Sequence, residues 1–476
     1  QIDIIKAQYP EKCPAVAQKR HDTVIVGTSD FSAVFNPIYC ELAFDATVTE
    51  LLFDGLVESD YNALPIPGMA DYEISGDGLT YTFTLKDGLY FSDGTPVTTE
   101  DVEFTMYALA DRDYFGPYDI LSVGISGLAD YYEGNAENIS GIEIIDEKKI
   151  RFTLDEPNAQ AIWFFRVGIL SKNYYGKDFK KGNMQTIEAL NDRPMGCGQY
   201  ILADYRLGES IKLTANDAYW KGTPKVKNLI FSVTPLGQEV ERVLTGEVDI
   251  DFPVPGDDTV KAAQEAGFMD IYRYPTNGYS YLGLNLDLPK YQDNRVRQAL
   301  VYGLNRKDAV ETVFGPYADV LNIPQSRLSW AYTEEGINPY DFNPERAAAL
   351  LKEAGWEKDN TGKLKKDGEI FKITFATSED NPFTEVLIPV MQDNYGKLGI
   401  ETEFETLDFM TLVDRVLAGE IDMWCLAWDL TPDPDDSASY HTDGPQNLYY
   451  YSNPEVDRLL EAGVKEQDRE KRKEIY

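Results

Sequence analysis

The clearest pattern of apolar and polar positions lies in residues 79–102. From 80 to 86 apolar residues alternate with threonines and a lysine, the period of two expected for a strand with one buried face. Two Asp-Gly dipeptides that favour turns follow. Thr98 and Asp101 then have the spacing of a capping box, and a mostly apolar stretch comes after them. The segment is therefore predicted to form a strand, two turns and a helix that begins after Thr98.

Shorter patterns of both kinds continue through the first half of the chain. Apolar runs and alternation predict strands at 142–154, 211–214 and 229–233. Helical spacing predicts two short helices at 238–244 and 258–266. A glycine follows each of these helices closely, and glycine readily takes the left-handed conformation that ends a helix.

The second half of the chain alternates more regularly between helix and strand. Helices are predicted at 293–304, 343–354, 384–398 and 409–417, and strands at 371–376, 400–406 and 421–428. Asn343 and Pro344 supply an N-cap and a first helical residue. The run at 421–428 is almost continuously apolar, which predicts a strand that is buried on both faces. This half of the chain is therefore predicted to be α/β.

The length of the chain requires more than one domain. Its 476 residues are too many for a single hydrophobic core. The candidate boundary is Tyr274–Gly278, where proline and glycine lie between extended segments. No apolar run approaches the roughly 18 residues that a membrane-spanning helix requires.

The charge balance excludes some classes of partner. The chain has 44 Lys and Arg against 81 Asp and Glu, a net charge of −37. This excess repels nucleic acid phosphates and anionic lipid, so neither is expected to be a partner. The carboxylates are spread along the chain, which favours a highly soluble surface over a single acidic site.

Residue types that support catalysis and metal binding are scarce. The two histidines are His21 and His441, and the four cysteines form no CxxC pair. The sequence contains no HExxH, GxSxG, Walker A or GxGxxG pattern. The acidic stretch at 433–436 lacks the glycine and glutamate of a calcium loop, so we interpret it as a structural turn. We therefore expect no enzymatic activity, no cofactor and no metal site.

Several segments, in order along the chain, resemble those of one protein family. They are 45–57 (D-A-T-V-T-E-L-L-F-D-G-L-V), 79–102, 193–220, 281–306, 343–356 and 453–460. The third contains P-M-G-C-G-Q-Y and N-D-A-Y-W, which are similar to P-x-G-x-G-x-Y and N-x-x-Y-W of the family. Their order and spacing resemble extracellular solute-binding protein family 5, the receptors of oligopeptide, dipeptide and nickel ABC importers.

The resemblance implies an α/β, two-lobed class II periplasmic-binding-protein fold with the ligand cleft between the lobes. Lobe I would comprise residues 1–275, with an extra subdomain at about 48–166, and lobe II residues 276–476. Family chains continue beyond the helix that contains Tyr476. We therefore expect the segment that returns to lobe I to be absent from this sequence.

The resemblance also implies a role and a location. The family's receptors bind a solute, close, and deliver it to the membrane permease of an ABC importer. We expect this chain to be a monomer that binds short peptides outside the cytoplasm, as a cell-surface lipoprotein or a periplasmic protein. An oligosaccharide or a metal chelate such as nickel remains the alternative ligand.

Candidate residues for peptide binding follow from the same resemblance. In peptide receptors of this class, the extended ligand pairs with lobe I backbone, which here corresponds to Tyr39, Cys40 and Glu41. The alternative is that these residues form a plain loop. The ligand ammonium meets a buried aspartate after a tryptophan-containing strand, and Asp429 is the nearest candidate. This chain has one residue fewer than usual before its D-P-D element, so the aspartate is less certain than the backbone segment.

Three tryptophans are further candidates for contacts with the ligand. Trp330, Trp424 and Trp428 would stack on a sugar or line pockets for peptide side chains; packing in the core is the alternative for each. Asp435 is more typical of a structural residue. Loss of the ammonium-binding aspartate would favour a different ligand, such as an oligosaccharide. Nickel is the weaker alternative because His441 alone offers little.

Overall fold

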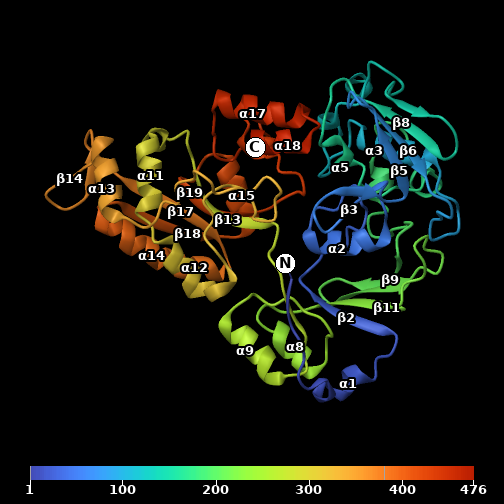
Figure 1. Ribbon diagram of the computed structural model, residues 1–476, viewed down its shortest axis with the longest axis horizontal. Helices are drawn as coiled ribbons and strands as arrows, with labels where there is room; N and C mark the ends of the chain where they lie inside the picture. The colour runs from blue at the N-terminus through green and yellow to red at the C-terminus, as the bar shows by residue number, and fades with distance from the viewer. Residues whose placement is uncertain (1, 380) are drawn as a thin grey trace.

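The computed structural model describes residues 2–379 and 381–476, which form two lobes joined by extended segments (Figure 1). Below, lobe I denotes the residues before 276 and lobe II those from 276 onward. The buried core of lobe I runs from Phe31 to Phe231, whereas the two core clusters of lobe II lie within 291–449. Among the described residues, no core cluster combines buried side chains of both lobes.

The main sheet of lobe I has four strands, in the spatial order β2, β11, β10 and β9. Their bounds are Thr23–Thr28, Asn228–Val233, Ser210–Ala215 and Tyr200–Arg206. β2 is parallel to β11, and the other neighbours are antiparallel. A further parallel bridge joins Val26 to Ile250. The structure confirms the strands predicted at 211–214 and 229–233, which are β10 and β11.

A second sheet of lobe I contains the segment with the clearest alternation. Its strands, in spatial order, are β5 (Ala70–Ile74), β6 (Thr80–Leu85), β8 (Lys149–Thr153) and β7 (Ile142–Ile144). The apolar residues of β6 are buried and its threonines are more exposed, as predicted. Helix α3 (Thr99–Leu109) begins at the predicted capping box, where the Thr98 N–H donates to Asp101 Oδ2 at 2.9 Å.

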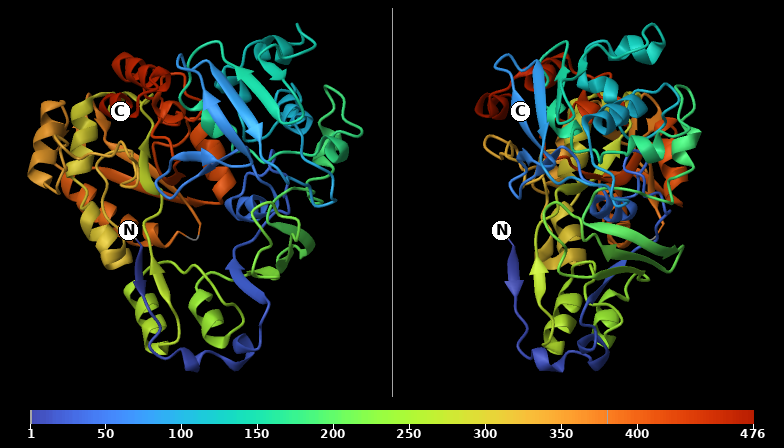
Figure 2. Two further views of the ribbon diagram at one scale, coloured as in Figure 1. Left: turned by 45° about the vertical axis from the view of Figure 1, so that its right-hand side comes forward. Right: turned by 90° about the vertical axis from the view of Figure 1, so that its right-hand side faces the viewer.

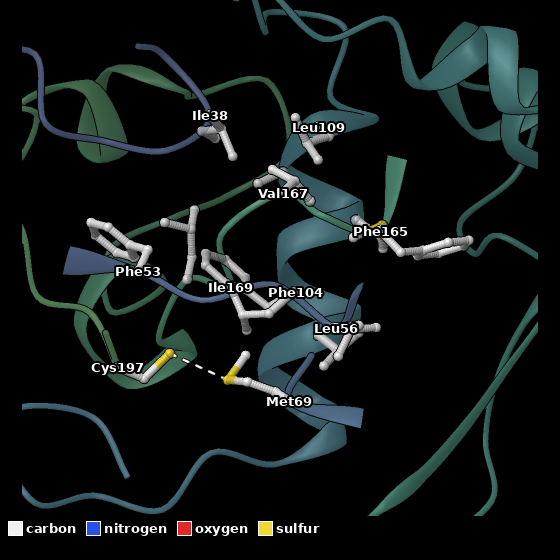
Figure 3. Packing of buried hydrophobic residues seen from close by; sticks show 14 of the residues in the cluster. Ile38, Phe53, Leu56, Met69, Phe104, Leu109, Phe165, Val167, Ile169 and Cys197 are labelled. Carbon is white, nitrogen blue, oxygen red and sulfur yellow. Dashed lines mark hydrogen bonds between the residues drawn. The ribbon is translucent and has the colours of Figure 1, made fainter. Parts of the chain in front are cut away.

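Large apolar side chains from both sheets and from α3 meet in one continuous core. Figure 3 shows the part of this core where Phe104 and Leu109 of α3 lie near side chains from the connecting segments. Leu56 and Phe165 are completely buried in it. Cys197 is 1% exposed, and its Sγ lies 3.5 Å from Met69 Sδ. Burial raises the pKa of the Cys197 thiol to about 12. This cysteine therefore packs as a small apolar side chain.

The main sheet of lobe II has the spatial order β13, β19, β17 and β18. The bounds are Gly278–Leu284, Met423–Asp429, Lys372–Ser378 and Glu401–Leu407. β13 is antiparallel to β19, whereas β17 is parallel to both β18 and β19. The helices α11 (Asn294–Tyr302), α13 (Pro344–Glu353), α14 (Pro382–Leu398) and α15 (Phe409–Leu417) agree closely with the predicted ranges.

One prediction about this sheet is wrong in part. The run at 421–428 was predicted to be buried on both faces, but burial within β19 is confined to Met423, Trp424 and Cys425. Beyond them half-buried and exposed residues alternate. β17 pairs only with the start of β19, so the second half of β19 extends past its neighbour on that side.

The segment Tyr274–Gly278 lies between two strands. β12 (Ile271–Arg273) ends just before Tyr274–Gly278, where β13 starts. β1 (Asp3–Ile5) lies antiparallel to β12 (Figure 2). The Leu430 N–H donates to the Asn277 carbonyl at 2.7 Å. The connecting segment is thus tied to the carboxyl end of β19.

The last two helices of lobe II lie against lobe I (Figure 1). They are α17 (Pro454–Lys465) and α18 (Arg469–Ile475). The Ala159 N–H donates to the Val464 carbonyl at 2.9 Å, and Lys465 Nζ lies 2.9 Å from Glu156 Oε2. The C-terminal helices therefore bridge the two lobes.

Shorter elements complete the fold. The remaining helices are α1 (Ala15–Gln18), α2 (Ala43–Leu52), α4 (Leu128–Glu133), α5 (Ala161–Phe164), α6 (Lys172–Tyr175), α7 (Gln185–Glu188), α8 (Glu239–Thr245), α9 (Asp257–Ala266), α10 (Pro289–Gln292), α12 (Arg306–Phe314) and α16 (Ser437–Tyr440). The remaining strands are β3 (Val57–Ser59), β4 (Pro65–Pro67), β14 (Glu357–Lys358), β15 (Leu364–Lys366) and β16 (Glu369–Ile370). Short 3₁₀ turns occur at Pro10–Lys12, Ile120–Val123 and Gly315–Tyr317. Within the described ranges, no helix is both long enough and apolar enough to cross a membrane.

Candidate functional site

The parallel strands β2, β11, β18 and β19, and the residue Ile250 that is bridged to β2, are followed by segments that we call the interlobe loops. They comprise residues 29–42, 234–238 and 250–256 of lobe I and residues 408–410 and 429–436 of lobe II. In α/β sheets, ligands bind outside the carboxyl ends of the strands. In Figure 1 the segment between β2 and α2 lies on the side of lobe I that faces lobe II. These loops are therefore the candidate site.

The two lobes approach each other at one end of this region. A methyl group placed on Gly315 of lobe II would lie 3.6 Å from the carboxylate oxygens of Asp257 in lobe I. Asp257 is the first residue of α9 and directly follows the interlobe loop at 250–256. The Arg273 guanidinium also lies 5.7 Å from the centre of the Tyr317 ring. This loop of lobe I therefore lies next to lobe II.

The candidate peptide-pairing segment Tyr39–Glu41 offers acceptors rather than donors. The N–H groups of Tyr39 and Cys40 both donate to the Asn36 carbonyl at 3.0 Å, so both are occupied. The carbonyls of Tyr39, Cys40 and Glu41 accept no hydrogen bond from any described residue. These carbonyl oxygens therefore remain unoccupied as hydrogen-bond acceptors among the described residues.

A buried carboxylate holds this segment in place. Asp45, in the first turn of α2, is completely buried. Its oxygens accept hydrogen bonds from the Ser32 N–H, the Ser32 hydroxyl and the Ala33 N–H, at 2.9–3.0 Å. The Tyr114 hydroxyl donates to the Ile38 carbonyl at 2.6 Å. The loop that presents the three carbonyls is thus fixed from both ends.

Tyr39 points its side chain into the protein. It is 9% exposed, and its hydroxyl, like the Asn36 side-chain nitrogen, is buried without a partner among the described residues. Burial raises the pKa of Tyr39 above its ordinary range. Its ring centre lies 5.4 Å from that of Tyr114. The Tyr39 ring is therefore part of the packed interior of lobe I.

Two of the predicted tryptophans lie in one aromatic cluster on β19. Trp424 is 1% exposed and stacks on Tyr449, with ring centres 6.0 Å apart. Trp428 is half-buried and stacks on Tyr281 at 6.0 Å. The Trp428 Nε1 donates to the Tyr449 hydroxyl at 2.9 Å. Trp424 therefore belongs to the core, whereas Trp428 has surface available to a ligand.

Asp429 is the last residue of β19 and is exposed. It lies opposite Gly278, the first residue of β13, and its carboxylate accepts no hydrogen bond from a described side chain or backbone group. The next residue, Leu430, is the one bonded to Asn277. The carboxylate is therefore free at the point where the chain crosses between the lobes.

Comparisons with known proteins identify the family of this chain. The model of a family described as bacterial extracellular solute-binding proteins, family 5 middle region, matches residues 65–450. The chain belongs to this family. It is therefore a member of a substrate-binding transport family rather than of an enzyme family, and the family places it outside the cytoplasm.

Curated relatives of this solute-binding protein cover almost the whole chain. The oligopeptide-binding protein AppA of Bacillus subtilis (strain 168) is 27% identical over 467 residues, which are 95% of this chain and 82% of AppA. The dipeptide-binding protein of Pseudomonas aeruginosa (strain PAO1) is 28% identical over 466 residues, 93% of this chain and 84% of the relative.

Solved structures show the same fold. AppA from Bacillus subtilis in complex with a nonapeptide has a TM-score of 0.79 at 25% identity and covers 95% of this chain and 89% of that chain. Lactococcal OppA with an endogenous peptide in the closed conformation has a TM-score of 0.81 at 23% identity and covers 96% and 91%. The two-lobed α/β fold of class II periplasmic binding proteins is therefore confirmed.

In this solute-binding protein Trp330 lies away from the other two tryptophans. Its ring lies 5.0 Å from the Arg469 guanidinium and 5.5 Å from that of Arg472. It also makes an edge contact with the ring of Tyr476. Trp330 therefore packs against the C-terminal helix α18 and not beside Trp424 and Trp428.

The acidic stretch at 433–436 forms the structural turn that the sequence favoured. The Asp435 N–H donates to Asp433 Oδ1 at 3.1 Å, and the Ser437 N–H donates to Asp435 Oδ2 at 3.1 Å. Asp433 forms a two-pronged ion pair with Arg472, and each of these side chains is only 7% exposed. The described residues contain no cluster of His, Cys, Asp and Glu suited to a metal ion.

Sequence reasoning missed Asp436. Its Oδ2 accepts a hydrogen bond from Gln325 Nε2 at 2.7 Å. Burial, and to a smaller extent the neighbouring carboxylates of Asp435 and Asp433, raise the pKa of Asp436 to about 7. No local signal in the sequence identifies this residue, because Gln325 comes from a loop more than a hundred positions away.

Proposed function

We propose that this protein is the substrate-binding receptor of an ABC importer and that it binds short peptides between its two lobes. The observation that carries the proposal is that the carbonyl oxygens of Tyr39, Cys40 and Glu41, in an interlobe loop, accept no hydrogen bond from the described residues. Main-chain recognition of a peptide requires unoccupied backbone groups on the receptor, and it gives affinity while tolerating different side chains. The curated relatives with peptide-binding names support the same ligand class.

The two ends of the site have different roles in this proposal. Tyr39, Cys40 and Glu41 accept hydrogen bonds from the N–H groups of an extended peptide. Asp429, exposed and without a partner in the described chain, pairs with the peptide ammonium. Trp428 contributes an aromatic face beside it, and Trp424 supports that face from the core.

The arrangement of the lobes suits a receptor that closes on its ligand. In this proposal the lobes are residues 1–275, with a subdomain at 48–166, and residues 276–476, and they rotate about Tyr274–Gly278. A ligand that contacts both lobes favours the closed form by its greater affinity for that form. The permease of the importer would recognise the closed form of a monomeric receptor, held at the outer face of the membrane as a lipoprotein or free in the periplasm.

Identification of the ligand that co-purifies with the protein tests this proposal. The purified protein is denatured in acid, and the released small molecules are analysed by mass spectrometry. We expect peptides of two to about eight residues, the class for which main-chain pairing is suited. An oligosaccharide ladder, or a metal chelate in stoichiometric amount, would contradict the peptide assignment and support the corresponding alternative. Protein that is first unfolded, washed free of ligand and refolded provides the blank.

A further inference from the structure

We propose that the receptor selects peptides that are rich in apolar residues and carry net positive charge, and that it discriminates against acidic peptides. This inference rests on the proposed peptide binding between the lobes and specifies the ligand class. Two independent properties of the interlobe loops carry it: the large apolar side chains that they expose, and the complete absence of lysine and arginine from them.

Large apolar side chains are exposed in the interlobe loops of both lobes. In lobe I, Leu236 is 67% exposed, and the loop at 250–256 exposes Phe252 to 63%. In lobe II, Phe409 and Met410 are 58% and 63% exposed at the start of α15, directly after the carboxyl end of β18. Apolar side chains exposed in these loops can be buried by apolar groups of a ligand that binds between the lobes.

Every charged side chain within the same loops is acidic. The loops contain Asp30, Glu41, Asp251, Asp408, Asp429, Asp433, Asp435 and Asp436, and no lysine or arginine. Asp433 is neutralised by Arg472, and Asp435 and Asp436 are largely enclosed in the acidic turn. The exposed carboxylates are those of Asp30, Glu41, Asp408 and Asp429. A ligand that contacts these loops therefore meets carboxylates and apolar groups.

Two of the three cations at the border of the interlobe loops have polar partners. Arg242 donates to the Val233 carbonyl and to the hydroxyls of Thr234 and Ser232. Arg206, the last residue of β9, is paired with Glu209. Arg166 is exposed on lobe I outside these loops, with its guanidinium 5.9 Å from the Trp163 ring centre. The loops themselves offer no cation to a carboxylate of the ligand.

This pattern selects by attraction and by repulsion together. A lysine or arginine side chain of the peptide gains a favourable interaction with nearby carboxylates, whereas a glutamate is repelled and loses hydration without compensation. The protein's net charge of −37 also attracts cationic peptides at longer range. Because ions screen such interactions, the preference must weaken as the salt concentration rises.

The test uses three octapeptides that share the same five apolar residues and one glycine and differ at two positions, which are both lysine, both glutamine or both glutamate. Calorimetry at low salt should give the lysine peptide an affinity about tenfold or more above that of the glutamate peptide, with the glutamine peptide between them. The difference in affinity between the lysine and glutamate peptides should shrink in 0.5 M salt.

Equal affinities, or tighter binding of the glutamate peptide, would overturn the inference and leave peptide binding intact. Failure of all three peptides to bind would instead contradict the proposed function.

Matched variants test the apolar part of the inference. Met410→Ser and Leu417→Ser remove similarly exposed side chains, 63% and 56%, from opposite ends of α15. Met410 lies at the interlobe end, so its replacement should weaken binding of the apolar lysine peptide several-fold, while Leu417→Ser should leave it unchanged. Both variants should unfold at similar urea concentrations. Equal binding by the two variants would remove the apolar contact from the inference.

Discussion

Carboxylates in this protein take different roles according to their partners. Asp45 is buried and holds a loop through backbone and hydroxyl donors, whereas Asp433 is buried and neutralised by Arg472. Asp436 is held by one amide donor, and burial raises its pKa. Asp429 is exposed and unpaired among the described residues. Of the four, Asp429 is therefore the carboxylate most available to a ligand.

The role of Asp429 leads to a prediction about peptide termini. Asp429→Asn should strongly weaken binding of peptides with a free ammonium and leave binding of their N-acetylated forms unchanged, since an amide cannot pair with the ammonium charge. Binding is measured as the ligand-induced rise in stability, which is about 2.7 kcal/mol at 100 times the dissociation constant. Glu137→Gln, which removes an exposed carboxylate of lobe I outside the interlobe loops, is the control for a general loss of negative charge. A loss that is equal for free and acetylated peptides would exclude Asp429 from the ammonium role.

Asp436 should make the stability of the protein depend on pH near neutrality. Its pKa is raised from an ordinary value of 3.8 to about 7 in the folded state, so the folded state binds the proton more tightly than the unfolded chain does. Its stabilising contribution is complete below pH 3.8 and is lost as the pH rises through about 7. Relative to Asp436→Asn, the free energy of unfolding of the wild type should therefore fall between pH 4 and pH 8. Urea unfolding at several pH values measures both proteins, and a constant difference would contradict the assignment.

At the scale of elements, α18 joins the acidic turn at 433–436 to α17 through an ion pair and hydrogen bonds. Arg472 on α18 pairs with Asp433 and donates to the Gly463 carbonyl of α17 at 2.9 Å. The Tyr476 hydroxyl donates to Asp435 at 3.1 Å. Because α17 also contacts lobe I, the acidic turn is linked to both lobes. Trp330, which the sequence suggested as a ligand contact, packs its ring against the Arg472 guanidinium of this ion pair.

The buried ion pair between α18 and the acidic turn should contribute more to the free energy of unfolding than the exposed ion pair of Lys465 does. Arg472→Met leaves the Asp433 carboxylate buried without compensation, which typically costs about 3–5 kcal/mol. Lys465→Met breaks an ion pair whose side chains are 57% and 69% exposed, and such pairs contribute about 0–1 kcal/mol. Chemical denaturation measures both. The double variant Asp433→Asn with Arg472→Met should recover part of the loss, and equal stability of the two single variants would contradict the assigned role of the buried pair.

At the scale of the whole molecule, the proposed site depends on two sheets that present the carboxyl ends of their parallel strands to a shared region. In this proposal lobe I would supply unpaired carbonyl oxygens, and lobe II would supply an aromatic face and a carboxylate. The core clusters of the two lobes are separate, and Asn277 ties the crossing segment to the end of β19. Separate cores allow the lobes to move as rigid bodies about a short connection. This arrangement suits a receptor that signals ligand binding by closing.

Much of the local structure was determined by the sequence itself. The alternation in β6, the capping box of α3 and the glycines that end α8 and α9 predicted these elements correctly. Each depends on residues within a few positions of one another, so its physical cause is visible in the sequence. The motifs spaced along the chain likewise identified the family, which the family comparison confirmed.

Contacts between distant residues were decided only by the tertiary structure. The sequence could not show that the N–H groups of Tyr39 and Cys40 already donate hydrogen bonds. It also could not show that the ring of Trp330 packs against α18. The hydrogen bond from Gln325 to Asp436 was equally invisible. Nor could the sequence show where β17 stops pairing with β19. Burial, pKa and the availability of a donor or acceptor depend on neighbours brought together by folding. The sequence therefore determined the elements and the kind of receptor, whereas the fold decided which groups remain free for a ligand.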